Sequence, residues 1–265
     1  MPIRTGTQPG RTGRLASRWA VVDGLRMHAR VSVDRAGNPA VVLVHGLVVS
    51  SRYMIPTAQK LAPYHEVYVP DLPGFGRSEK PPSVLDVAGL SDSLAAWMEA
   101  VGLGSAVLVG NSVGCQVIAD LALRHPERVE RAVLQGPTMD PEARTALRQA
   151  ARLALDGTRE PPSLLPIMLL DYLSAGLRRS FSTFQHALED RMEEKLPHLR
   201  VPTLVVRGDR DPIVPQRWAE RAARLLPEGK GRLVVVPGAA HTMNYAAPSE
   251  LARVVRAFVR EGEER

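Results

Sequence analysis

The chain has 265 residues and is 45% hydrophobic, which is long and apolar enough to bury one large core and excludes fibrous and wholly disordered classes. No apolar stretch approaches the roughly 20 residues that cross a bilayer, and the single cysteine, Cys115, cannot form an internal disulfide. We therefore expect one compact domain held by packing, without a membrane span, in the reducing environment of the cytoplasm.

The net charge of +6 does not by itself indicate a nucleic-acid partner, because most of the excess lies at one end of the chain. Arg4, Arg11, Arg14 and Arg18 all precede the first acidic residue, Asp23. We interpret residues 1–18 as a flexible basic leader, since they lack the apolar core of a secretory signal. Beyond the leader, basic and acidic residues are interleaved as on a solvated face, so no nucleic-acid partner is expected.

The predicted elements begin with an antiparallel hairpin turned at Asp23-Gly24, a pair suited to a tight turn. Short apolar runs without polar alternation follow, as is typical of a parallel sheet covered on both faces. These runs are residues 40–44, 66–70, 106–110, 131–135, 203–207 and 232–237. Amphipathic segments of helical length lie between or after them, at residues 51–62, 84–101, 113–125, 215–226 and 248–260. The pattern predicts an α/β fold with a mostly parallel central sheet flanked by helices.

One region breaks this alternation, because residues 139–197 contain no strand-like run and read as several helices. We interpret this insertion as a helical cap over the carboxyl edge of the sheet, where open α/β folds bind their ligands. Residues 19–138 and 198–265 are then the core. The alternative is a surface elaboration without function.

The stretch LVGNSVGCQV, residues 108–117, places a serine between two glycines directly after an apolar run. A strand that turns abruptly into a helix strains the corner residue, and Gly110 and Gly114 remove side chains that would collide there. The turn presents Ser112 outward, next to the unpaired N–H groups of the following helix. This is the Gly-x-Ser-x-Gly nucleophile elbow, so Ser112 is the candidate nucleophile.

A serine nucleophile needs a base, and the base needs an orienting acid. Of the seven histidines, His241 is the one on the loop between the last predicted strand and the last helix, at the carboxyl edge. The acid is expected after the run TLVVR, where Asp211 precedes a proline and is favoured. Asp209 is interpreted as a turn residue, and Asp140 is a third choice.

With these residues in place, the chain resembles the α/β-hydrolase fold family, in which nucleophile, acid and base follow the order of Ser112, Asp211 and His241. The resemblance runs from about residue 19 to 258 and includes VLVHGLVVSS, PDLPGFGRSEKP and RGDRDPIVP. It is nearest to esterases and to meta-cleavage product hydrolases. The resemblance implies an oxyanion hole formed by the backbone N–H groups of Leu47 and Val113, and a structural role for the histidine at position 45.

No cofactor and no metal site is expected from the sequence. No Gly-x-Gly-x-x-Gly follows a strand, and the glycines of DLPGFGRS are not followed by the Lys-Ser/Thr pair of a phosphate-binding loop. Potential metal ligands do not cluster. Cys115, one turn into the helix after Ser112, is interpreted as a small packed residue. The expected partner is a small-molecule substrate, and the oligomeric state is left open.

The resemblance implies a serine hydrolase that cleaves a small hydrophobic carboxylic ester through an acyl-enzyme. The insertion supplies much apolar and aromatic surface for such a substrate. Residues expected to line the substrate pocket are Asn111, Leu165, Met168, Tyr172, Arg178, Phe181 and Met243.

Two alternatives stay open. A meta-cleavage product hydrolase, which splits a carbon–carbon bond, is favoured by the Asn111-Ser112 pair and by cationic candidates for a substrate carboxylate, namely Arg178, Arg179 and Arg191. It is disfavoured by Thr242 and Cys115, where those enzymes commonly carry an aromatic residue and a glycine. The second alternative, from another class, is a small-molecule receptor on a hydrolase fold.

Overall fold

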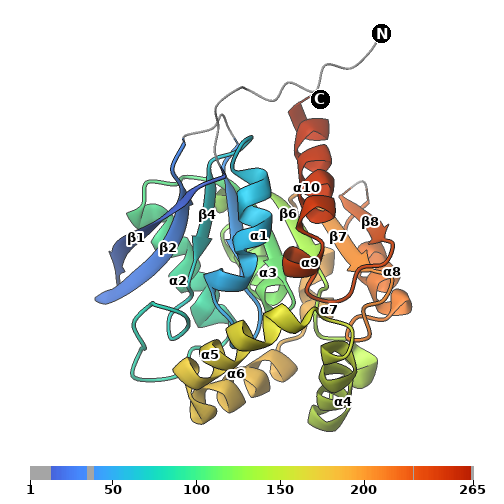
Figure 1. The fold of residues 1–265 in the computed structure, drawn as a ribbon. Coiled ribbons are helices and arrows are strands. Elements are labelled where there is room, and N and C mark those ends of the chain that lie inside the picture. Colours follow the sequence, from blue (N-terminus) through green and yellow to red (C-terminus); the bar gives the residue numbers. More distant parts are fainter. Residues whose placement is uncertain (1–12, 35–38, 229, 264–265) are drawn as a thin grey trace.

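A single mostly parallel sheet forms the centre of the computed structural model, which describes residues 13–34, 39–228 and 230–263 (Figure 1). Its strands are β1 (Leu15–Val22), β2 (Leu25–Ser32), β3 (Val41–Val44), β4 (Val67–Pro70), β5 (Ala106–Asn111), β6 (Val129–Gln135), β7 (Thr203–Gly208) and β8 (Gly231–Val236). They are ordered β1-β2-β4-β3-β5-β6-β7-β8. The pairs β1-β2 and β2-β4 are antiparallel and the others are parallel, which confirms the predicted fold class.

The opening hairpin turns at the predicted pair, where Asp23 and Gly24 have φ of +49° and +78°. Left-handed backbone at both positions is what a two-residue type I′ turn requires. The strand before the turn begins at Leu15, which pairs with Ser32. The predicted boundary of the leader at residue 18 is therefore too late, because backbone pairing includes residues 15–18 whatever their side-chain polarity. Residues 1–12 lie outside the described part of the chain.

Helices cover both faces of the sheet (Figure 1). On one face lie α1 (Ser51–Leu61) and α10 (Pro248–Glu263), and on the other lie α2 (Val87–Ala100), α3 (Val113–Arg124) and α8 (Gln216–Leu225). In β3, Val41 and Leu43 pack on the face covered by α1 and α10, and Val42 and Val44 pack on the face covered by α2, α3 and α8. This two-sided burial is the reason why the strand runs show no polar alternation.

Helix α2 begins later than the predicted start at residue 84. Asp86 caps it, accepting a hydrogen bond from the Gly89 N–H at 2.8 Å. An aspartate at the N-cap satisfies one of the N–H groups that a helix start leaves without a partner, so the helical hydrogen bonding begins at Val87.

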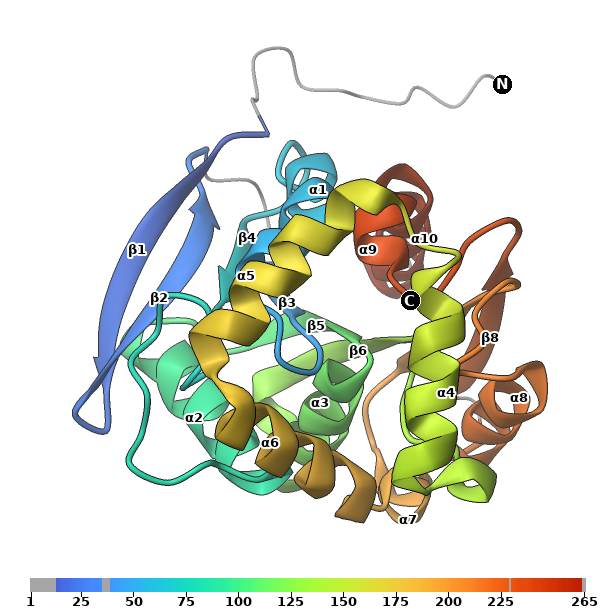
Figure 2. The ribbon, with the colours of Figure 1, turned by 60° about the horizontal axis from the view of Figure 1, so that its bottom comes forward.

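Between β6 and β7, all of the chain is described and its regular elements are helical, as predicted. The longer helices are α4 (Ala146–Gly157), α5 (Leu165–Ala175) and α6 (Leu177–Glu189), which we call the cap helices. Shorter ones are α7 (Met192–Lys195) and the 3-10 turns Pro141–Ala143, Pro162–Leu164 and Leu196–His198. In Figure 2 the cap helices lie in front of the sheet, with α5 and α6 on one side and α4 on the other. None of the described helices is long and apolar enough to cross a membrane.

A buried carboxylate joins three parts of the core near β2. Asp71 is 1% exposed and accepts hydrogen bonds from His28 Nδ1 (2.8 Å), the Ser51 N–H (2.6 Å) and the Arg77 N–H (3.0 Å). Burial alone would raise the pKa of Asp71, but these hydrogen bonds favour the ionised form and hold the pKa below its usual value. The carboxylate thereby fixes the amino end of α1, which follows directly after the loop from β3.

We expect Asp71→Ala to lower the free energy of unfolding by about 3 kcal/mol, because it leaves buried donors without an acceptor. Urea unfolding at pH 7 measures this. Since the folded pKa is depressed, the stabilisation is present above the ordinary value of 3.8 and is lost as the pH falls through the folded pKa. Asp209→Ala is the control, because that exposed carboxylate accepts one backbone N–H, from Gly238, and its loss costs about 1 kcal/mol or less. Equal losses in both variants would contradict the role of Asp71.

Candidate active site

Ser112 stands at the corner between β5 and α3 with φ of +55° and ψ of −121°, a conformation that non-glycine residues rarely adopt. The neighbouring glycines are required by close backbone contacts. A Cβ on Gly114 would lie 2.4 Å from the Val44 carbonyl oxygen, and one on Gly110 would lie 2.7 Å from the Gly114 backbone. The Ser112 side chain makes no capping hydrogen bond to α3, so its hydroxyl is not used by the helix.

His241 and Asp211 meet on the loops that follow β8 and β7. His241 Nδ1 lies 2.8 Å from Asp211 Oδ2, and both side chains are buried. The other carboxylate oxygen of Asp211 accepts hydrogen bonds from the N–H groups of Ile213 (2.8 Å) and Val214 (2.9 Å). With its orientation fixed in this way, the carboxylate selects the His241 tautomer that carries a proton on Nδ1.

His241 and Ser112 line the same cavity. Among the described residues, His241 Nε2 has no hydrogen-bond partner although it is buried. The structure therefore brings Ser112 and His241 to the wall of one cavity without a hydrogen bond between them. Catalytic hydrogen bonds are often long in unliganded enzymes and tighten when substrate binds.

Negative charge around His241 controls its pKa. Burial alone lowers the pKa, but the charge and hydrogen bond of Asp211, with the charges of Asp156 and Glu160, raise it to about 9. Burial raises the pKa of Asp156 to about 6, and the negative charges of Glu160 and Asp211 contribute to this increase. Both pKa values are thus raised at one end of the cavity, and perturbed pKa values are frequent in functional sites.

Two cap residues that the sequence did not single out hold the loop of His241. Asp156, in α4, accepts the His241 N–H at 3.4 Å. Glu160, just after α4, accepts the Thr242 N–H at 2.7 Å and also the Thr242 hydroxyl. Carboxylates at the end of a helix in the insertion carry no sequence signal of such contacts.

Of the two predicted oxyanion donors, Leu47 lies in the turn after β3 and Val113 is the first residue of α3. Both line the cavity with Ser112, and the Val113 N–H has no acceptor within the helix. His45 accepts the Leu72 N–H on Nε2 (3.0 Å), which leaves its proton on Nδ1 to be donated to the Gly46 carbonyl (3.0 Å). Burial lowers the pKa of His45 and keeps it neutral, so its role is to hold the turn.

A buried hydrogen-bond chain links this turn to the backbone of His241. The Gly46 N–H donates to the Tyr53 hydroxyl (2.6 Å), which donates to Asn111 Oδ1 (2.8 Å). Asn111 Nδ2 donates to Gln135 Oε1 (2.9 Å) and to the His241 carbonyl (3.1 Å), and Gln135 Nε2 donates to the same carbonyl (2.7 Å). Sequence reasoning found Asn111 beside Ser112 but missed Tyr53 and Gln135, which reach the site only through the fold.

The cavity has a volume of about 460 Å³ and is enclosed by loops of the sheet edge and by the cap helices. Of the predicted lining residues, Asn111, Leu165, Met168 and Tyr172 are present. Further lining residues include Thr138, Met139, Gln149, Leu153, Leu164, Phe184 and Ile213. Most of these side chains are apolar.

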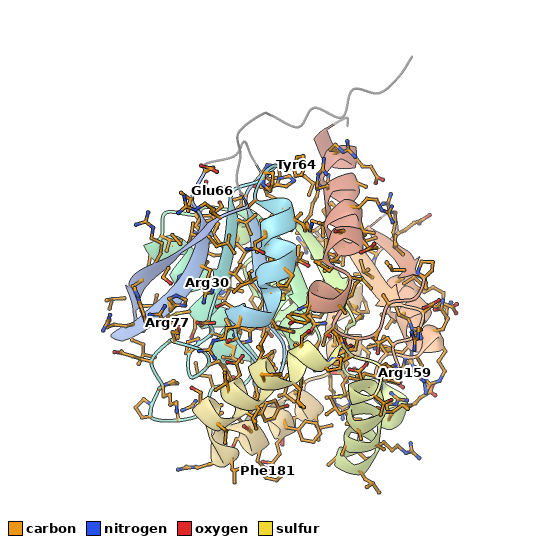
Figure 3. The ribbon with its side chains drawn as sticks, in the orientation of Figure 1. Arg30, Tyr64, Glu66, Arg77, Arg159 and Phe181 are labelled. Atoms are coloured by element: carbon orange, nitrogen blue, oxygen red, sulfur yellow. The ribbon has the colours of Figure 1, made fainter. Side chains whose placement is uncertain are left out.

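Three residues predicted to line the pocket do not line it, because the rotation of their helices directs the side chains to solvent or into the core. Phe181 is 62% exposed and extends from α6 away from the core (Figure 3), while Phe184 of the same helix lines the cavity. Arg178 is exposed on α6. Met243 is fully buried in the core beside α1 and α10, in the short helix α9 (Met243–Ala246).

The cationic side chains considered for a substrate carboxylate lie outside the cavity as well. Arg179 donates to the Pro81 carbonyl (3.1 Å), and Arg191 pairs with Glu194 (3.0 Å). Among the described residues, no arginine or lysine lines the cavity. Its charged groups are the acids Asp156 and Glu160 and the imidazole of His241.

The other candidates of the sequence have structural partners. Asp209 accepts the Gly238 N–H as a turn residue, and Asp140 pairs with Arg152 and Arg217. Cys115 is buried, and burial raises its thiol pKa well above the usual value, which disfavours a nucleophilic thiolate. In the described part of the chain, no group of three or more His, Cys, Asp or Glu side chains is placed to hold a metal ion.

A second Ser–His–Asp arrangement lies on the hairpin side of the molecule. His28 is bonded to Asp71 through Nδ1 and to Ser17 Oγ through Nε2 (2.9 Å). Ser17 belongs to the edge strand β1 and also accepts a hydrogen bond from Arg77 (3.0 Å). It has neither a helix start beside it nor a place in the cavity that Ser112 lines, so this arrangement is structural.

Known proteins resemble this chain over most of its length. Residues 41–254 match the model of the alpha/beta hydrolase family. The chain is 28% identical over 268 residues to a protein named carbamate hydrolase RutD of Caulobacter sp. strain K31, covering 90% of this chain and 96% of that one. It is 26% identical over 253 residues to the pimeloyl-[acyl-carrier protein] methyl ester esterase of Pectobacterium carotovorum, covering 85% and 96%.

A solved structure described as a bacterial membrane phospholipase A superposes with a TM-score of 0.81 at 24% identity, covering 96% of this chain and 88% of that one. At this identity the likeness shows the shared fold alone. The family match spans most of the sequence, and the relatives are named as hydrolases. The chain is therefore a hydrolytic enzyme that belongs to the alpha/beta hydrolase family.

Proposed function

We propose that the protein is a serine hydrolase that cleaves small hydrophobic carboxylic esters through an acyl-enzyme. One observation carries the proposal. His241 is held by Asp211 through Nδ1, its Nε2 is left without a partner among the described residues, and His241 and Ser112 line the same cavity.

In the proposed reaction, neutral His241 takes the proton of Ser112 on Nε2 as the serine oxygen attacks the ester carbonyl carbon. The N–H groups of Leu47 and Val113 bind the oxyanion, and Asp211 stabilises the imidazolium. His241 then gives the proton to the leaving alcohol, and an acyl-enzyme remains. A water molecule, deprotonated by His241, attacks this acyl-enzyme, and the carboxylic acid leaves as Ser112 recovers its proton.

The lining of the cavity supports a neutral substrate. Its wall is mostly apolar, and the charges of Asp156 and Glu160 oppose the entry of an anion. A ring-fission substrate with a carboxylate would meet no arginine or lysine among the described lining residues, so the carbon–carbon bond hydrolase is less well supported. A methyl ester esterase among the relatives agrees with ester cleavage. A location in the cytoplasm stays a prediction of the sequence.

Activity on short-chain p-nitrophenyl esters tests the proposal. We expect turnover and labelling by a fluorophosphonate probe in the native protein, and a loss of turnover of about 10⁴-fold or more in Ser112→Ala. Ser17→Ala is the matched control, since it removes the serine of the second arrangement and leaves the rate unchanged. Stoichiometric ester binding without turnover would instead identify a receptor, and far faster cleavage of a coloured dienoate would identify the carbon–carbon bond hydrolase.

The contact of Gly136 with the base gives a second prediction. A Cβ at this position would lie 2.9 Å from His241 Cε1 and Nδ1, so Gly136→Ala displaces the imidazole and lowers kcat by about 100-fold. Gly102→Ala introduces the same methyl group at a similar positive φ, with no atom within 4 Å, and leaves kcat unchanged. Thermal unfolding of both variants separates the shared backbone strain from the displacement. Similar kcat values in the two variants would contradict the placement of His241.

The charges around His241 predict the pH dependence of the rate. The base acts when it is neutral, so kcat/KM rises with pH along a limb set by its pKa of about 9. Asp156→Asn removes a negative charge that raises this pKa but keeps an oxygen for the His241 N–H, so the limb moves to lower pH. Asp92→Asn, an exposed acid paired with Arg124, leaves the profile unchanged. A limb that stays in place in Asp156→Asn would show that another group controls the rate.

A further inference from the structure

The outer side of α5 is apolar although it faces solvent. Leu165, Leu169, Leu170 and Leu173 are between 57% and 71% exposed and lie on one side of the helix. The one acid of α5, Asp171, is buried on the opposite side, where it accepts hydrogen bonds from Ser50 and Arg52, both at 2.7 Å. A surface helix ordinarily places its charged residues outward, so the orientation of α5 is inverted.

The other two cap helices also expose large apolar side chains. On α6, Leu177 is 90% and Phe181 is 62% exposed, and on α4, Leu147 is 81% exposed. Nine of the thirteen large hydrophobic side chains that are exposed in the described part of the chain lie on these three helices. Phe181 extends outward at the end of the molecule that the cap helices form (Figure 3), the end that Figure 2 turns toward the reader. We call this surface the cap face.

The charges of the cap are arranged with the basic groups outward. Residues 146–188 contain the arginines at positions 148, 152, 159, 178 and 179. Of these, in the part of the chain that the structure describes, only Arg152 forms an ion pair, with Asp140. The acids of the same segment are Asp156, Glu160 and Asp171, and each accepts hydrogen bonds from the core or its loops. Glu189, the last residue of α6, is an exposed acid next to this segment. Over residues 146–189 the exposed arginines, at positions 148, 159 and 178, therefore outnumber the exposed acids.

We propose that the cap face docks the protein onto an anionic lipid surface. Leucine and phenylalanine side chains on a helix that lies in the membrane plane enter the region between headgroups and acyl chains, and nearby arginines bind the acidic headgroups. A symmetric pair of copies joined through this face would bring the same arginines against one another, because such an interface is self-complementary. Charge complementarity therefore favours the lipid over a second copy.

The cap face is continuous with the cavity. Leu165 and Leu153 are 68% and 39% exposed and also line the cavity. A docked protein would hold this part of the cavity wall at the lipid, so an apolar ester could reach Ser112 without passing through water. This consequence rests on the proposed function, whereas the docking itself does not.

Binding of Ser112→Ala protein to phospholipid vesicles tests the docking without turnover. We expect co-sedimentation with vesicles rich in phosphatidylglycerol, at least tenfold weaker binding to pure phosphatidylcholine, and weakening by salt. The double variant Leu169→Gln with Leu173→Gln lowers the affinity at least tenfold, and Arg178→Gln lowers it about fivefold. Val21→Gln and Leu123→Gln, which replace exposed apolar residues elsewhere, leave it unchanged.

Cleavage of a water-soluble p-nitrophenyl ester by the same leucine variants, made in the active protein, shows that they are folded, because Leu169 and Leu173 do not line the cavity. Equal binding of all variants, or no binding to anionic vesicles, would overturn the proposal. So would a dimer, seen by sedimentation velocity, that the leucine substitutions dissociate. Since docking is measured with an inactive protein, its failure and a failure of the ester assay are separate results.

Discussion

The hydrogen bond between His241 and Asp211 is the point on which the candidate site depends. The other polar atoms of His241 are fixed as well, because its N–H donates to Asp156 and its carbonyl accepts from Asn111 and Gln135. Within the described structure, Nε2 is the one polar atom of this residue without a partner. The fold thus immobilises the imidazole and leaves free the nitrogen that a base requires.

The same arrangement joins parts of the chain that are distant in sequence. Asn111 precedes the nucleophile, Tyr53 belongs to the first helix, and Gln135 ends the strand beside β5. Because parallel strands end at one edge, their terminal residues meet there. Polar groups buried at that edge must find partners, and in this protein those partners are one another.

Much of the fold could be predicted because the apolar runs are unambiguous. Strands buried on both faces, such as β3 and β5, show as short uninterrupted runs, and the glycines around Ser112 show where strand turns into helix. Asp211 could be preferred to Asp209 from its place before a proline. Turn residues and the apolar pattern of strands are local properties, so they can be recognised in the sequence alone.

The cavity wall could not be predicted to the same degree. Phe181 and Phe184 are three residues apart, yet one faces solvent and the other the cavity, because packing of α6 sets its rotation. Asp156 reaches His241 across 85 positions of the chain, a contact that no spacing rule indicates. The start of β1 was missed because strand pairing is made by the backbone, which every sequence carries.

The contacts of the cap divide it into two mechanically separate parts. Helix α5 is fastened through Asp171 to the beginning of α1, directly after the turn that contains Leu47. Helix α4 is fastened through Asp156 to the backbone of His241. Withdrawal of α5 would pull on the turn that contains Leu47, and withdrawal of α4 would pull on the backbone of His241. Moving either helix to admit a larger substrate would therefore disturb either the Leu47 turn or His241. Substrate size is in this way coupled to the geometry of the proposed catalytic residues.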